Sequence, residues 1–132
     1  MRQKLRESID FREFARAIGE IVRFGEGEII FRENDVPACM YIVLAGSIEL
    51  TAHDKVIETI QANKALGIVS LLDGLPRTAT ARVKEPCELA MMDEKHFRYM
   101  VEEVPHFGWY VMRELAQRLR ATNAEESDYQ LT

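Results

Sequence analysis

The sequence predicts a mainly β domain, an antiparallel roll of jelly-roll type with one helix before it and two helices after it. Three observations support this fold class. Short β-prone runs recur between residues 21 and 92, turn residues separate them, and apolar positions repeat at helical spacing on either side. Many short strands at roughly even spacing are typical of sandwiches and rolls. With 132 residues, the chain has the length of one domain.

The N-terminal part predicts one helix and two strands. Gln3 to Ile21 carries apolar residues mostly at three- or four-residue steps, which indicates an amphipathic helix with a break near Asp10. Ile21–Phe24 and Glu28–Phe31 are short β-prone runs on either side of a Gly-Glu-Gly turn.

The strongest strand pattern follows. Tyr41–Leu44 and Ile48–Thr51 are expected to form two strands joined by a reversal at Ala45-Gly46-Ser47. Glycine suits such a reversal because it adopts a positive φ without steric cost.

Three further strands complete the roll. Val56–Ile60 is one, with His53-Asp54-Lys55 as the loop before it. Thr78–Val83 and Cys87–Met92 are the other two, and Lys84-Glu85-Pro86 separates them.

The pattern becomes helical after Asp93, which is a candidate N-cap for a helix through Val101. Pro105 suits the first turn of a longer helix that reaches about Asn123. We therefore expect one domain over residues 1–123, divided into an N-terminal helix (1–20), a β-roll (21–92) and C-terminal helices (93–123). A polar tail, 124–132, is expected to be frayed or disordered.

Charge and hydropathy exclude several partners. The net charge of −5, with basic residues interleaved among acids, argues against a nucleic-acid binder, which needs clustered Lys and Arg. The sequence has no apolar run near the roughly 20 residues of a membrane span, and the N-terminus lacks an apolar signal core. The expected location is the cytoplasm, with no membrane partner.

The sequence indicates neither a metal centre nor a catalytic one. Cys39 and Cys87 lack metal or redox spacing, so both are expected to be buried as small apolar side chains. His53, His96 and His106 show no paired ligand spacing. Because nucleophile-elbow and Walker-type motifs are also missing, we expect no cofactor and no enzymatic activity.

The segment from Leu66 to Thr80 holds the candidate binding site. Gly67 provides a turn, the apolar run after it can expose backbone N–H groups, and Arg77 follows among small residues. Convergent amides and a guanidinium suit a single phosphate, as does a helical turn starting near Val69 or Ser70. On spacing alone, a solvated turn around Arg77 is equally compatible.

Ser70-Leu71-Leu72 followed by Pro76-Arg77-Thr78-Ala79-Thr80 resembles the phosphate-binding cassette of cyclic-nucleotide-binding domains. This is the family of the catabolite activator protein and of the regulatory subunits of cyclic-nucleotide-dependent kinases. Phe31–Asp35 and Tyr41–Ile48 resemble the family's early strands and glycine turn, and the similarity runs from about residue 11 to residue 123.

The resemblance implies a role for each cassette residue. The amides of Val69, Ser70 and Leu71 would hold a cyclic phosphodiester, and Arg77 would pair with its charged oxygen. Thr78 would add a hydroxyl to the phosphate or to a guanine amino group, and Ala79 would let a sugar approach closely. The ligand-binding residues expected in this way are Gly67, Ile68, Val69, Ser70, Leu71, Arg77, Thr78, Ala79, Thr122 and Asn123.

The chain departs from the family at Ile68, where a glutamate usually accepts a hydrogen bond from the ribose 2′-hydroxyl. Ile68 cannot accept it, so affinity is expected to fall about tenfold to a hundredfold. Weak binding, a different phosphorylated ligand and an empty site kept as structure remain open. A carboxylate from Glu33, Asp35 or Asp73 is a candidate substitute.

The last helix has two interpretations. Arg118, Thr122 and Asn123 align with the part of the family's long helix that caps the base, or are ordinary polar residues near a helix end. The stripe Met112/Leu115/Leu119 suits the seam of a homodimer, or packs on the roll.

The resemblance implies a stand-alone regulatory module that binds cAMP, cGMP or a related phosphorylated ligand and signals by moving its C-terminal helices. Since the chain ends at Thr132 with no visible output domain, output is expected through an unidentified protein effector or a homodimer. The alternative is an interaction module whose cassette no longer binds nucleotide.

Overall fold

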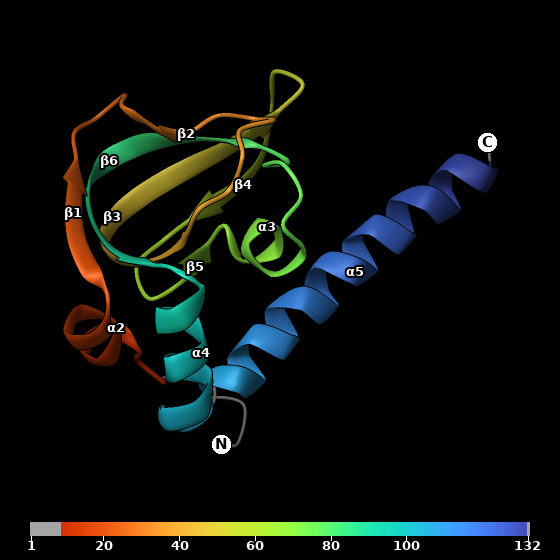
Figure 1. The fold of residues 1–132 in the computed structure, drawn as a ribbon. Helices are drawn as coiled ribbons and strands as arrows, with labels where there is room; N and C mark the ends of the chain where they lie inside the picture. The colour runs from red at the N-terminus through yellow and green to blue at the C-terminus, as the bar shows by residue number, and fades with distance from the viewer. Residues whose placement is uncertain (1–8, 132) are drawn as a thin grey trace.

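The computed structural model describes residues 9–131, and the side chains as far as residue 121. A six-stranded antiparallel sheet curls into a roll, and the helices gather at one end of it (Figure 1). The elements in chain order are α2 (Arg12–Ile18), β1 (Glu20–Phe24), β2 (Ile29–Phe31), β3 (Met40–Ala52), β4 (Lys55–Ile60), β5 (Ala65–Leu66), α3 (Ile68–Asp73), β6 (Thr80–Met92), α4 (Glu94–Glu103) and α5 (Phe107–Leu131). The strand order is β1-β6-β3-β4, with β2 on β6 and β5 on β3, so the predicted fold class is confirmed.

The two longest strands, β3 and β6, each replace a predicted pair of strands. Both halves of β3 pair with β6, so the chain bends at Ala45-Gly46-Ser47 without reversing. Gly46 has φ +90°, and a Cβ there would collide with the carbonyl oxygen of Pro86. The pairing register shifts at this point, which is the mark of a bulge. The predicted reversal, and the predicted break at Lys84-Glu85-Pro86, are therefore wrong.

The helix boundaries also depart from the sequence pattern. The predicted N-terminal helix lies partly in residues 3–8, outside the described chain. Its described part ends at Ile18, because the backbone of Gly19 is extended. Ile21, predicted to be the last helical residue, belongs to β1 and pairs with Ala90 of β6. At the other end of the chain, α5 begins two residues after Pro105.

The backbone of α5 stays helical to Leu131, past the predicted end at Asn123 and through the tail predicted to fray. The helix can extend this far because no glycine or proline follows Gly108. Asp93 caps α4 as predicted: its carboxylate accepts a hydrogen bond from the backbone N–H of His96 at 2.9 Å.

Two apolar clusters hold these elements together. One fills the roll and includes Phe31, Val43, Ile48, Leu89 and Cys87. The other, which we call the helix-side core, joins α2, α4 and the start of α5 to the roll. Its largest members include Phe11, Met40, Phe97 and Phe107. The rings of Phe11 and Phe107 meet edge to face, with their centres 5.2 Å apart.

The first turns of α5 are therefore anchored, while its C-terminal half stands clear of the roll (Figure 1). Of the two cysteines predicted to be buried, Cys87 is buried and Cys39 is half-buried. None of the described helices is both long and apolar enough to cross a membrane.

Candidate functional site

The cassette residues lie between β5 and β6, in the turn formed by α3 and the loop after it (Figure 1). Gly67 connects β5 to α3 with φ +83°, in the left-handed region. A Cβ at this position would lie only 2.5 Å from Nη1 of Arg77. Glycine is required here both for its backbone angle and for the close approach of the arginine.

Arg77 faces inward and is 4% exposed. Its Nη1 donates a hydrogen bond to the carbonyl oxygen of Gly67 at 3.1 Å, and its Nη2 donates to that of Cys39. The guanidinium carbon lies 4.2 Å from the centre of the Phe31 ring, a cation–π contact. The backbone N–H of Arg77 donates to the carbonyl oxygen of Asp35. These contacts exclude the solvated-turn interpretation.

The partners of this buried cation are all neutral. Among the residues with described side chains, no carboxylate pairs with Arg77. Burying a charge without an opposite charge is costly, so buried cations in proteins are usually paired with an anion. The position is thus electrostatically suited to an external anion.

Most of the predicted site residues line one small cavity next to Arg77. Its walls are Phe31, Leu50, Leu66, Gly67, Ile68, Val69, Ser70, Arg77, Thr78, Ala79 and Arg118. Leu71 does not line it. Its side chain packs against the helix-side core, and its backbone N–H donates to the carbonyl oxygen of Gly67 at 3.4 Å. Thr122 and Asn123 lie on α5, and their side chains are outside the described part of the structure.

The cavity holds about 40 Å³. Sites for drug-sized ligands measure roughly 300–1,000 Å³, whereas a water molecule needs only about 10–15 Å³. In this arrangement the cavity therefore has room for water and not for a nucleotide.

Part of its wall comes from α5. Arg118 contributes from that helix, and its Nη2 lies 3.7 Å from a carboxylate oxygen of Glu58 on β4. Both side chains are more than a third exposed, so this pair is easily separated. Arg118 thus lies beside the cassette, and its role in capping a base stays a prediction.

Ile68, the residue that departs from the family pattern, is 5% exposed and belongs to the helix-side core. None of the predicted substitute carboxylates lines the cavity. Asp35 and Asp73 instead accept hydrogen bonds from nearby backbone N–H groups, and Glu33 lies beside His53. In this arrangement, therefore, no carboxylate takes the place of the missing glutamate among the described residues that line the cavity, and the substitution stays a prediction.

Ser70 is buried as well, and its hydroxyl donates to the carbonyl oxygen of Pro76 at 3.5 Å. This bond ties α3 to the loop that carries Arg77. Sequence reasoning missed Phe31, Leu50 and Leu66 as cavity walls and Glu58 as a partner of Arg118. The only sequence signal for these residues was the alternation of apolar and polar side chains along their strands. That alternation does not reveal which strand faces which helix.

Comparison with known proteins finds a matching family model and similar sequences. A family model described as the cyclic nucleotide-binding domain matches residues 21–104. The CRP-like cAMP-activated global transcriptional regulator of Mycobacterium tuberculosis (strain H37Rv) is 25% identical over 112 residues, which are 81% of this chain and 50% of that protein. The cGMP-dependent protein kinase, isozyme 1, of Drosophila melanogaster is 32% identical over 76 residues, which are 57% of this chain and 10% of that protein.

Solved structures share the fold. The catabolite activator protein of Thermus thermophilus superposes with a TM-score of 0.77 at 22% identity, covering 87% of this chain and 56% of that one. The cAMP-bound form of the EAL enzyme Bd1971 superposes with a TM-score of 0.59 at 26% identity, covering 85% of this chain and 31% of that one. This chain spans half or less of the length of the two curated relatives named above.

Proposed function

This chain belongs to the cyclic nucleotide-binding domain family, and on that premise we propose that it is a regulatory, non-catalytic module that binds cAMP, cGMP or a related phosphorylated ligand at Arg77. The observation that carries the proposal is the burial of Arg77 without a carboxylate partner among the described side chains. The EAL enzyme Bd1971, which is 26% identical to this chain, was solved in a cAMP-bound form, and this supports the choice of ligand class.

Each residue of the cassette has a role in this proposal. The guanidinium of Arg77 exchanges its two carbonyl partners for the charged oxygens of the phosphate, which its planar fork matches. The amides at the start of α3 add donors. Ala79 is small and buried at the cavity wall, where it leaves space for the sugar, and Thr78 is exposed at the rim.

The small volume of the cassette cavity explains how ligand binding would move α5 and so produce a signal. Since about 40 Å³ does not admit a nucleotide, binding selects an arrangement in which the wall formed by Arg118 has moved outward with α5. A hydrogen bond links this helix to the cassette strand: the backbone N–H of Ala65 donates to the hydroxyl of Tyr110 at 2.9 Å. Ala65 lies two residues before Gly67, so this bond is the path by which we propose that movement of α5 reaches the cassette.

Output then passes through the surface of α5. Met112 and Leu119 of the predicted stripe are 55% and 62% exposed, whereas Leu115 packs against the helix-side core. The stripe is thus divided, with Leu115 holding the helix and the other two free for contact. We propose that a second copy of the chain or a protein effector covers Met112 and Leu119.

Ile68 favours a second candidate, an interaction module that no longer binds nucleotide. The residue is buried in the core, and the cavity lacks a carboxylate to accept the ribose hydroxyl among its described lining residues. This reading leaves the unpaired charge of Arg77 without an explanation, which is why we place it second.

Titration calorimetry of the wild type and of Ile68→Glu with cAMP and with cGMP separates the two candidates. The proposed function predicts saturable heat with at least one nucleotide, and tighter binding by Ile68→Glu. Restoring one charge-assisted hydrogen bond is expected to increase affinity about tenfold to a hundredfold. Absence of heat with both nucleotides in both proteins would favour the interaction module, provided that circular dichroism shows both to be folded.

A further inference from the structure

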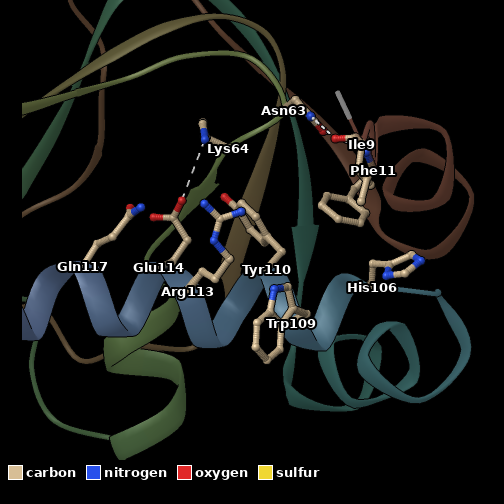
Figure 2. Close-up of a pocket in the computed structure, with 10 residues that line it drawn as sticks. All are labelled: Ile9, Phe11, Asn63, Lys64, His106, Trp109, Tyr110, Arg113, Glu114 and Gln117. Carbon is tan, nitrogen blue, oxygen red and sulfur yellow. Dashed lines mark hydrogen bonds and ion pairs between the residues drawn. The ribbon is translucent and has the colours of Figure 1, made fainter. Parts of the chain in front are cut away.

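A second and much larger cavity lies against the first turns of α5 (Figure 2). It measures about 710 Å³, within the size range of small-molecule sites. We call it the α5 cavity. Four segments line it: the chain before α2, the loop before β5, the loop between α4 and α5, and α5 itself. The lining residues are Ile9, Phe11, Asn63, Lys64, His106, Trp109, Tyr110, Arg113, Glu114 and Gln117.

Hydrogen bonds fix the chain before α2, the segment leading into β5, and α5 relative to one another. The side chain of Asn63 accepts from the backbone N–H of Phe11 at 2.8 Å and donates to the carbonyl oxygen of Ile9 at 2.7 Å. The Tyr110 hydroxyl accepts from Ala65, as described above, and the rings of Tyr110 and Phe11 lie 5.2 Å apart. The walls are therefore preformed, with an aromatic floor, and a ligand would not have to order them.

The charges of the α5 cavity do not balance. Lys64 and Arg113 are cations, and Glu114 is the carboxylate among the lining residues. Lys64 Nζ lies 3.9 Å from Glu114 Oε1, a loose pair (Figure 2). Arg113 is half-buried and makes no hydrogen bond or ion pair within the part of the chain whose side chains are described. An unpartnered guanidinium beside a cavity of this size is suited to a carboxylate.

The remaining lining residue that decides the ligand class is Trp109. Trp109 lines the cavity and is 52% exposed, and in Figure 2 its ring projects from α5 in the direction opposite to the side chains of Tyr110 and Arg113. An exposed indole ring offers a flat apolar surface on which a planar ligand can stack.

We propose that the α5 cavity is a second binding site, separate from the cassette, for a small aromatic carboxylate. The carboxylate pairs with Arg113, and the planar body lies against the floor formed by Phe11 and Tyr110, with the exposed Trp109 at the rim of the cavity. The proposal does not depend on nucleotide binding, since the lining residues of the two cavities do not overlap.

Trp109 makes the test direct, because it is the single tryptophan of the chain. The full chain is titrated with 2-naphthoate, and with 2-naphthamide as a neutral analogue of the same shape, while Trp109 fluorescence is followed. We expect a saturable change with 2-naphthoate and at least about tenfold weaker binding of the amide, since the amide lacks the charge that Arg113 recognises.

Three variants locate the site. Arg113→Gln should weaken 2-naphthoate binding at least about tenfold, whereas Arg120→Gln, an exposed arginine of the same helix, should not change it. Arg77→Ala should also bind 2-naphthoate like the wild type. Thermal unfolding confirms that each variant is folded.

Four results would overturn the proposal. They are a change in fluorescence that does not saturate, equal affinity for the amide, wild-type affinity in a folded Arg113→Gln, or loss of 2-naphthoate binding in Arg77→Ala. The last result would place the ligand in the cassette. Failure of cAMP and cGMP to bind would leave the Arg113 result unaffected, so the two proposals fail independently.

Discussion

Replacing Gly67 with alanine should destabilise the fold by disturbing Arg77, and the effect can be worked out from the structure. At φ +83° an alanine costs about 1–2 kcal/mol for the left-handed backbone. The added Cβ would also lie 2.5 Å from Nη1 of Arg77, so the guanidinium must leave the carbonyl oxygen of Gly67. Losing a hydrogen bond made by a charged group costs about 1.5–3 kcal/mol, and the sum is about 2.5–5 kcal/mol.

Gly74 provides a matched control at the other end of α3. It has φ +72°, and nothing lies within 4 Å of the Cβ that an alanine would introduce. Gly74→Ala should therefore cost only the backbone term, about 1–2 kcal/mol. The difference between the two variants isolates the close approach of Arg77 to Gly67.

Urea unfolding followed by Trp109 fluorescence measures both free energies of unfolding. In an Arg77→Ala background, Gly67→Ala should become as mild as Gly74→Ala, because the group with which its Cβ collides is gone. Equal costs for the two glycine variants in the wild-type background would refute this account of the cassette.

The remaining predictions concern α5 and α4. Tyr110→Phe removes the acceptor of the backbone N–H of buried Ala65 and should lower the free energy of unfolding by about 1–3 kcal/mol. Hydrogen exchange at the Ala65 amide should accelerate. Unchanged protection of that amide would argue against the link between α5 and the cassette. The double variant Met112→Glu/Leu119→Glu should keep the free energy of unfolding within about 0.5 kcal/mol of the wild-type value, since both residues are exposed. It should abolish any self-association that sedimentation detects in the wild type. Persistence of a dimer would show that another surface forms it. The backbone N–H of His96 donates to Asp93 and lowers the pKa of its carboxyl. The stability that this hydrogen bond contributes is therefore fully present above the pKa of Asp93 in the unfolded chain, and is lost as pH falls through its lower pKa in the folded protein. Asp93→Asn should therefore lose less stability on acidification, and parallel acid-unfolding curves would contradict this assignment.

The sequence predicted the strands well where the evidence was local. Alternation and turn residues correctly indicated β4 and the two short strands β1 and β2. Gly46 shows where local evidence fails. A glycine with positive φ serves equally in a reversal and in a bulge, and only its position opposite Pro86 in β6 decides between them.

The candidate site was predicted to a similar extent and for the same reason. Its central residues are contiguous in the chain, so a short motif contains Gly67, Arg77 and Ala79 together. The walls contributed by Leu50 and the pairing of Arg118 with Glu58 depend on how strands and helices meet, which no local pattern records. The small volume of the cassette cavity is likewise a property of packing.

Cyclic-nucleotide affinity in paired arginine variants tests the central claim most directly. Arg77→Ala removes the buried cation, whereas Arg82→Ala removes an exposed one on β6 that does not line the cavity. Calorimetric titration with the nucleotide that binds the wild type should give at least about tenfold weaker binding for Arg77→Ala, and wild-type binding for Arg82→Ala. A folded Arg77→Ala protein with wild-type affinity would contradict the claim that this guanidinium receives the phosphate.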